Sequence, residues 1–195
     1  MSKVSKNKAA VAVPSIELLR SGVQLLDPDF SAENAKIAIV AAKFNAAIVD
    51  RLVDAAIQTL RAAGVLAESI TLVRVPGAWE LPIVANALAE TGEIDGIVAL
   101  GCIIRGETAH FDVITRESAS GLMRVALEHS MPVSNGVLAC ENEEQALQRC
   151  GGAENKGAEA AQALMETLGV MSTMEMPLDD LLEQMDWDLG QEGFR

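Results

Sequence analysis

The segment that most constrains the fold of this chain is an uninterrupted apolar run over residues 97–104, Ile-Val-Ala-Leu-Gly-Cys-Ile-Ile. Its hydrophobic residues do not alternate with polar ones, which is typical of a strand covered on both faces. A polar loop follows directly, and a helical pattern begins near residue 110. Because ligands bind just beyond the carboxyl ends of strands in an open parallel sheet, we expect a ligand site at this loop.

Strand and helix patterns alternate through the middle of the chain. Apolar runs predict strands, and apolar residues at helical spacing predict helices between them. The expected strands are 36–42, 69–75, 94–104 and 132–138, and the expected helices are 45–64, 79–91, 110–130, 141–150 and 155–169. This alternation predicts an α/β fold, a flavodoxin-like three-layer α/β/α sandwich with a four-stranded parallel sheet.

The two ends differ from this central domain, which we place at residues 36–170. Residues 1–35 form an N-terminal extension, partly disordered, whose apolar residues 23–26 fit a short strand added to a sheet edge of the same or a neighbouring subunit. Residues 171–195 hold seven acidic residues and one arginine, which is −6 of the net charge of −13. This acidic extension is either solvated or a short amphipathic helix that docks on a partner.

The composition excludes several classes of partner. A strongly negative chain does not suit nucleic acid as its main partner, although a few local cations can still bind a small anion. No apolar segment approaches the roughly 20 residues that span a membrane. The three cysteines are too widely spaced for a metal pattern and odd in number, so we expect no metal, no disulfide framework and a cytoplasmic location.

His110 is the strongest candidate for chemistry. It stands at the start of a predicted helix, where the positive end of the helix dipole disfavours imidazolium, and this suits a proton shuttle. The alternative is a structural histidine bonded to a backbone carbonyl. The other histidine, His129, lies at a helix C-terminus, where the dipole favours a cation, so structure alone explains it.

Two other strand ends carry side chains suited to a ligand. Phe44 follows the first strand and either stacks on a planar heterocycle or belongs to the core. Trp79 and Glu80 follow the second strand, where Trp79 can wall a cavity and Glu80 can accept hydrogen bonds from a polyol. Alternatively, Glu80 is a carboxylate favoured by the helix dipole.

The loop after the long apolar run is suited to a phosphate. The free N–H groups of residues 106–108 and the Thr108 hydroxyl can bind an anion, while Glu107 would repel one and contributes through its backbone. The alternative is an ordinary strand–helix turn. Arg149 is either a bidentate partner for a phosphate or a solvated cation at a helix end. Lys156 lies in the first turn of a predicted helix, where the helix dipole disfavours a cation, so local stability does not explain it.

Five blocks in the same order resemble the family of 6,7-dimethyl-8-ribityllumazine synthases: residues 44–45, 76–82, 100–112, 132–136, and 145–149 followed by 155–157. The run Arg-Gly-Glu-Thr-Ala-His-Phe-Asp at 105–112 is the most specific, and the resemblance spans about residues 36–170. It implies a transferase of riboflavin biosynthesis that condenses 5-amino-6-(D-ribitylamino)uracil with 3,4-dihydroxy-2-butanone 4-phosphate. The products are the lumazine, phosphate and water, and no metal or cofactor is implied.

The resemblance also implies a role for each matching residue. The implied roles are catalysis for His110 and Arg149, and phosphate binding for Arg149, Glu107 and Thr108. Phe44 would stack on the pyrimidine, Asn45 would bind substrate, and Ala78, Trp79 and Glu80 would bind the ribityl chain. Cys102, Ile103 and Ile104 would contact the pyrimidine edge, Lys156 would contact the heterocycle with Glu159 behind it, and Asn135 would close the site from the neighbouring subunit.

The implied assembly is a homopentamer, and some members of the family build a hollow shell of about 60 subunits from such rings. A functional link to riboflavin synthase is implied as well. We expect the phosphate loop to need Arg149 of its own chain, with Asn135 and Lys156 supplied by a neighbour.

Three features depart from the family pattern. Asn135 stands where many members have Phe, residues 150–154 are one residue shorter than in many members, and the acidic extension is additional. The alternatives are a non-catalytic flavin- or lumazine-binding module, a shell-forming protein, and a related enzyme that makes riboflavin from lumazine. The presence of both His110 and Arg149 favours the synthase.

Overall fold

A computed structural model describes residues 32–174 of the chain, and its centre is a four-stranded parallel sheet. The strands are β1 (Ile37–Ala42), β2 (Ile70–Val75), β3 (Gly96–Ile104) and β4 (Val133–Cys140). Their order in the sheet is β2-β1-β3-β4, and every neighbouring pair is parallel. The expected parallel sheet is therefore confirmed.

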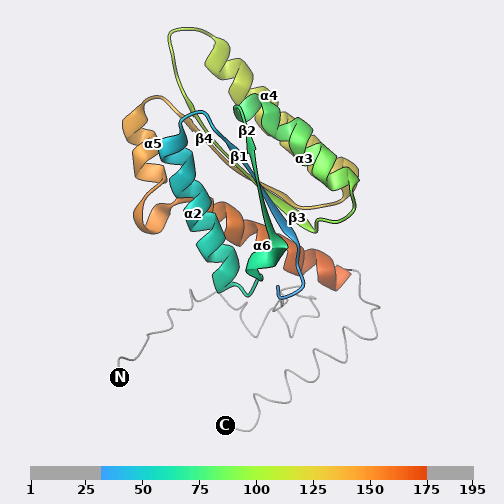
Figure 1. Ribbon diagram of the computed structural model, residues 1–195. Helices are drawn as coiled ribbons and strands as arrows, with labels where there is room; N and C mark the ends of the chain where they lie inside the picture. Colours follow the sequence, from blue (N-terminus) through green and yellow to red (C-terminus); the bar gives the residue numbers. More distant parts are fainter. Residues whose placement is uncertain (1–31, 175–195) are drawn as a thin grey trace, which may run out of the picture.

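Helices cover both faces of this sheet, as Figure 1 shows. The pair α3 (Leu81–Glu90) and α4 (His110–His129) lies on one face. The other face carries α2 (Ala46–Ala62), α5 (Glu143–Arg149) and α6 (Lys156–Met174). Short 3-10 turns occur at Ala67–Ser69, Ala78–Glu80 and Gly152–Glu154. The three-layer α/β/α sandwich is thus confirmed.

The core consists of two layers separated by the sheet. Alternate residues of β1 point to opposite faces, so Ile37 and Ile39 pack toward α2 and α6 while Ala38 and Val40 pack toward α3 and α4. The seven residues from Gly96 to Cys102 are all buried, which explains why this strand reads as one apolar run.

The observed elements differ from the expected ones mainly at their ends. The last helix continues to Met174, past the expected end at Gly169. Gly169 and its neighbour Leu168 are both buried in this helix, and this packing outweighs the cost of about 1 kcal/mol for a helical glycine. A 3-10 turn over Ala78–Glu80 also precedes α3. The other boundaries shift by one to two residues, which is ordinary for helix and strand ends.

Two predictions concern parts of the chain outside residues 32–174. The expected edge strand at residues 23–26 lies there, as does the acidic extension beyond the last residues of α6. Among the described helices, none is both long and apolar enough to span a membrane.

The close packing of α2 against α6 requires a glycine at Gly157. A Cβ at this position would overlap the carbonyl oxygen of Leu52 and come within 2.7 Å of its carbonyl carbon. The backbones of the two helices are therefore in direct contact at this point. Because backbone atoms cannot rotate away as a side chain can, a larger residue would force the helices apart.

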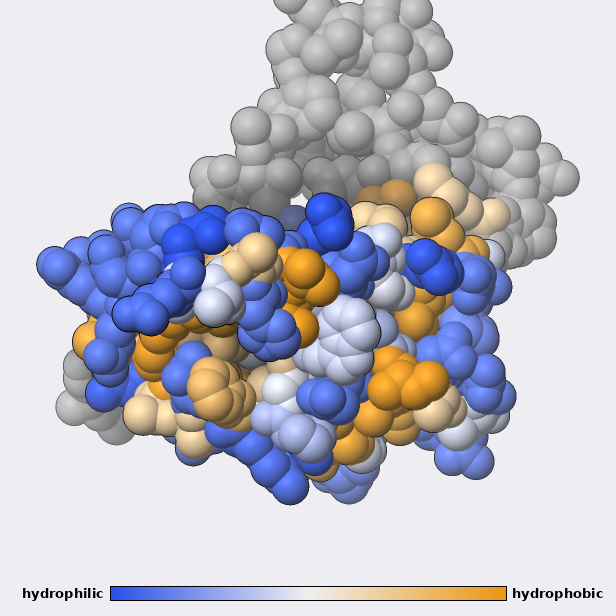
Figure 2. Space-filling view, turned by 90° about the horizontal axis from the view of Figure 1, so that it is seen from above, coloured by the Kyte–Doolittle hydropathy of each residue, from blue (hydrophilic) through white to orange (hydrophobic). Residues whose placement is uncertain are grey.

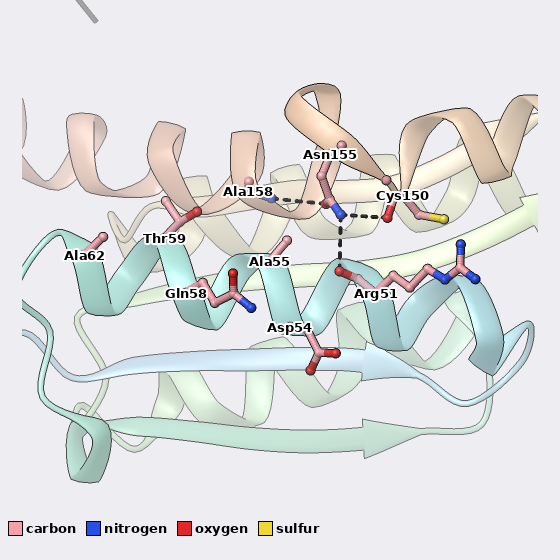
Figure 3. A pocket seen from close by; sticks show the side chains of 11 residues that line it. Arg51, Asp54, Ala55, Gln58, Thr59, Ala62, Cys150, Asn155 and Ala158 are labelled. Carbon is pink, nitrogen blue, oxygen red and sulfur yellow. Dashed lines mark hydrogen bonds between the residues drawn. The ribbon is translucent and has the colours of Figure 1, made fainter. Parts of the chain in front are cut away.

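Asn155 fixes the start of α6 just before this glycine. It is only 7% exposed, and its Oδ1 accepts a 2.8 Å hydrogen bond from the N–H of Gly157. Its Nδ2 donates to the carbonyl of Cys150, at 2.8 Å, and to that of Arg51 on α2, at 3.2 Å. Figure 3 shows Asn155 pointing between α2 and the connection from α5 to α6. One amide therefore holds three helices together.

We expect Gly157→Ala to lower the free energy of unfolding by about 2 kcal/mol or more, because overpacking against backbone cannot relax locally. Chemical denaturation followed by circular dichroism measures the effect. Gly151→Ala is the matched control, since a Cβ there would meet nothing nearer than 3.7 Å. Equal stability of the two variants would contradict the backbone contact.

Candidate active site

A cavity of about 700 Å³ opens at the carboxyl edge of the sheet. Figure 2 looks down on this edge, where hydrophobic residues form several patches among hydrophilic ones. The ends of β1, β2 and β3 and the first turn of α4 meet around the cavity, as the sequence predicts for a parallel sheet. Nine predicted site residues line it: Phe44, Ala78, Trp79, Glu80, Cys102, Ile103, Ile104, Thr108 and His110.

Phe44 extends from the end of β1 into the open side of the cavity. Its side chain is 69% exposed, so the alternative of a core phenylalanine is excluded within one subunit. Its backbone N–H donates to the carbonyl of Pro76 at 3.0 Å, and the preceding Lys43 donates to Val75 at 2.7 Å. These two bonds continue the pairing of β1 with β2 and fix the backbone from which the ring extends.

Asn45 has a structural position rather than one on the cavity wall. It adopts the left-handed conformation, with φ +56°, at the start of α2, a conformation that Asn tolerates better than most residues. Its Nδ2 donates a 3.0 Å hydrogen bond to the carbonyl oxygen of Cys102. Asn45 thereby joins the ends of β1 and β3 and sets the backbone of the apolar strand where it meets the cavity.

Glu80 closes the turn after β2. Its Oε2 accepts a 2.8 Å hydrogen bond from the N–H of Gly77, while the carboxylate also borders the cavity. Trp79 lies beside it and is about half exposed. The position combines the two roles considered for Glu80, because the carboxylate caps a turn and still faces ligand space.

His110 is the first residue of α4 and its imidazole is available for chemistry. The ring borders the cavity and makes no hydrogen bond to any residue between 32 and 174, in contrast to the structural alternative. The backbone N–H of His110 lies 3.4 Å from the Thr108 hydroxyl. The ring of His129, by contrast, bonds Asn86 through Nε2 at 3.0 Å, as expected for a structural histidine.

The phosphate-sized loop lies between β3 and α4. Gly106 and Thr108 border the cavity, and a Cβ at Gly106 would meet no atom within 4 Å. The exposed Glu107 does not line the cavity. The open space beside Gly106 leaves room for an anion against the loop backbone.

Four other predicted site residues lie in a second cavity of about 420 Å³. It is formed by β4, the end of α5 and the start of α6, and it shares no lining residue with the first cavity. The four residues are Asn135, Arg149, Lys156 and Glu159. The structure therefore divides the predicted site into two groups within one subunit.

The division corrects one expectation. Arg149 was expected to complete the phosphate loop of its own chain, but it lines the second cavity instead. The reason is topological, because Arg149 ends α5 beyond the edge strand β4, whereas the loop begins after the inner strand β3. Arg149 uses Nη1 to bond the carbonyl of Gln145, at 2.9 Å, and the rest of its guanidinium is exposed.

Lys156 has a local partner that the sequence alone did not identify. Its Nζ lies 2.7 Å from both carboxylate oxygens of Glu159, three residues later in the same helix. This ion pair compensates for a cation at the helix N-terminus, where the dipole disfavours it. Asn135 on β4 faces the same cavity, and its Oδ1 accepts from the N–H of Val137 at 3.0 Å.

Cys102 combines a cavity position with burial. It is 3% exposed, and burial raises the pKa of its thiol to about 11, with smaller contributions from the nearby Cys140 and Cys150. Burial also raises the pKa of Cys140 above its usual value. Such thiols are poor nucleophiles, so Cys102 serves as packing, as its place in an apolar run predicts.

Arg105 is a residue near the site that the sequence analysis did not single out. It ends the apolar strand, and its guanidinium bonds both Asp112 and Glu141 and lies over the ring of Phe111. The signal in the sequence is the pairing of Arg105 with an acidic residue in the first turn of the next helix.

Among residues 32–174 there is no group of three or more acidic, histidine or cysteine side chains that could hold a metal.

The fold and the cavities define an α/β protein of flavodoxin-like architecture with a candidate ligand site at the carboxyl edge of its sheet. The chain belongs to the 6,7-dimethyl-8-ribityllumazine synthase family, whose model matches residues 34–172. The matched region contains all the predicted site residues.

Curated relatives carry the same family name over nearly their whole length. A 6,7-dimethyl-8-ribityllumazine synthase of Desulfovibrio desulfuricans is 47% identical over 155 residues, covering 79% of this chain and 99% of the relative. Those of two strains of Nitratidesulfovibrio vulgaris are each 46% identical over 153 residues, covering 78% of this chain and 98% of the relative.

We expect Cys102 to resist alkylation in the native protein. A thiol whose pKa is about 11 holds about 100-fold less thiolate at pH 8 than one at the ordinary value of 9.0. Iodoacetamide labelling followed by mass spectrometry measures this, and labelling in denaturant is the control for a reactive reagent. Rapid native labelling at Cys102 would contradict the assigned burial.

Proposed function

We propose that this protein forms 6,7-dimethyl-8-ribityllumazine from 5-amino-6-(D-ribitylamino)uracil and 3,4-dihydroxy-2-butanone 4-phosphate, releasing phosphate and water. The observation that carries the proposal is the cavity at the carboxyl edge, where the free imidazole of His110 meets the loop at Gly106–Thr108. Membership in the synthase family supports the same reaction.

The catalytic unit that we propose is a ring of identical subunits, a homopentamer, with each active site shared by two neighbours. One subunit supplies the cavity with His110, and the next supplies the cavity with Arg149 and Lys156. The separation of these residues within one subunit supports this arrangement, since neither cavity is lined by both His110 and Arg149. Heterologous contacts of this kind close into rings.

Exposed apolar side chains support self-association. On the α3 and α4 layer, Ile83, Met123 and Leu127 are each more than half exposed. Large apolar side chains exposed on the same layer favour contact of that layer with another protein. We propose that this protein is a neighbouring subunit. A measurement of mass in solution distinguishes single rings from a shell of about 60 subunits.

The chemistry that we propose requires several proton transfers and the departure of phosphate. The amine attacks the ketone and a first water leaves to give an imine. Phosphate is then eliminated, which leaves an enol that becomes a carbonyl, and the ribitylamino nitrogen attacks that carbonyl and expels a second water as the ring closes. The imidazole of His110, which has no hydrogen-bond partner among the described residues, is placed to move protons at these steps. Holding two substrates in one orientation supplies a large part of the acceleration in reactions of this type.

Charge and hydrogen-bond donors suit the phosphate at the loop. The N–H groups of residues 106–108 and the Thr108 hydroxyl offer donors from one subunit, and Arg149 offers a guanidinium from the other. Asn135 would approach the heterocycle from the second subunit without the stacking area of the Phe found in many family members. We therefore expect weaker binding of planar ligands than in those members.

The roles proposed for the remaining residues follow their positions. Phe44 would stack on the pyrimidine, and Glu80 would bind the ribityl hydroxyls. Lys156, held by Glu159, would approach the heterocycle from the neighbour. The product would pass to riboflavin synthase, and we propose a cytoplasmic location, which fits three free cysteines.

The proposal is tested by mixing the two substrates with purified protein and following lumazine fluorescence, together with a solution mass. We expect a rate well above the uncatalysed condensation, and Arg149→Ala chiefly raises the KM for the phosphate substrate. Arg61→Ala, at the far end of α2, is the control. If the wild-type protein gives no rate above the uncatalysed condensation, the enzyme assignment is wrong. If Arg149→Ala leaves the KM for the phosphate substrate unchanged, Arg149 does not belong to the phosphate site.

A further inference from the structure

We propose that Arg105 is a positioning residue, whose clamp on Asp112, Glu141 and Phe111 holds the phosphate loop and His110 in their working geometry. The proposal deepens the proposed function and rests on it for the reaction itself. Arg105 is the last residue before the loop, and His110 is the first residue of the helix after it. The clamp therefore spans the loop on which both depend.

The contacts of Arg105 involve all three guanidinium nitrogens and one face of the planar group. Nη1 and Nη2 donate to the two carboxylate oxygens of Asp112, at 3.1 and 2.9 Å. Nε donates to Glu141 at 2.7 Å. The carbon of the guanidinium lies 4.0 Å from the centre of the Phe111 ring, an arrangement that adds a cation–π attraction. A planar fork with this many directed bonds has a single orientation.

The side-chain partners of Arg105 come from two separate parts of the carboxyl edge. Asp112 and Phe111 belong to the first turn of α4, and Phe111 itself lines the cavity. Glu141 lies in the turn between β4 and α5, and the backbone of Arg105 continues the sheet by donating to the carbonyl of Cys140 at 2.9 Å. Arg105 therefore joins β3, α4 and the β4–α5 turn at one point.

Arg105 is not a second phosphate ligand in this arrangement. One guanidinium faces two carboxylates, which leaves a local charge of about −1. The hydrogen bond from Arg105 lowers the pKa of Asp112, and the bond to Asp112 raises the pKa of Arg105, so both stay charged near neutral pH. An incoming anion would have to displace a bidentate partner, which makes a direct role in phosphate binding unfavourable.

The clamp also contributes little to the stability of the whole fold. The side chains of Arg105, Asp112 and Glu141 are 35%, 58% and 59% exposed, and ion pairs at such sites are screened by solvent. Its consequence is local, because it ties the two ends of a loop that has few other contacts. Within that loop, the one side-chain bond is the contact between the Thr108 hydroxyl and the N–H of His110, at 3.4 Å.

Arg105→Lys and Asp112→Asn test the clamp from its two sides, and Arg116→Lys is the matched control. Arg116 lies on the same helix as Asp112, its one ion pair among residues 32–174 is with the exposed Glu117, at 3.0 Å, and the lysine keeps its charge. Two readouts are measured. The first is amide hydrogen exchange of residues 105–113 in the substrate-free protein, and the second is kcat with the KM of each substrate.

We expect both clamp variants to exchange faster over residues 105–113, to lower kcat by about tenfold or more, and to raise the KM of the phosphate substrate. The KM of the pyrimidine substrate changes much less, because Phe44 follows β1 and Glu80 follows β2, so neither residue belongs to the segment that the clamp holds. Arg116→Lys changes nothing. The difference between the two KM values distinguishes a positioning role from a general loss of stability, because a loss of stability would change both.

Unchanged exchange and kcat in both clamp variants would overturn the proposal. A higher KM for the phosphate substrate alone, with unchanged exchange, would also overturn it and make Arg105 a direct ligand. Exchange is measured without substrate, so its result stands even if the wild-type protein forms no lumazine. In that case the proposed function fails while the clamp on the loop is still tested.

Discussion

The parallel pairing of β1 with β3 is the constraint on which the rest of the structure depends. Both strands are covered on both faces, and their register runs from the pair Ile37–Gly96 to the pair Ala41–Leu100. Parallel strands end at the same edge, so Phe44 after β1 and the loop after β3 meet there. The bond from Asn45 to the Cys102 carbonyl joins the two strand ends directly beside the cavity.

A second constraint arises where α2 meets α6. The contact of Gly157 with the backbone of Leu52, and the bonds of Asn155 to three helices, set where α5 ends and α6 begins. Arg149 and Lys156 stand on either side of that connection. Their separation from the first cavity is therefore set by the helix packing, and this separation is the basis of our proposal that two neighbouring subunits share one site.

The sequence predicted the layers and most of the candidate site because both depend on local patterns. Apolar runs without alternation identified the buried strands, and the aromatic and ionisable residues that follow these strands indicated Phe44, Glu80 and His110 as candidate site residues. It could not place Arg149, because the position of α5 relative to the sheet edge is a property of tertiary packing. It also missed the Arg105 clamp, since Glu141 is 36 residues away in the chain and local patterns carry no such pairing.

Activity of mixed assemblies tests the shared site most directly, at low substrate concentration. His110→Ala and Arg149→Ala subunits, each nearly inactive alone, are co-assembled in equal amounts, and wild type with the double variant is the control for mixing. We predict that both mixtures reach about one quarter of wild-type activity, since a working site needs two suitable neighbours, each present with a probability of about one half. If the two single variants stay inactive together while the control keeps about one half, each subunit carries its own complete site and the account is wrong.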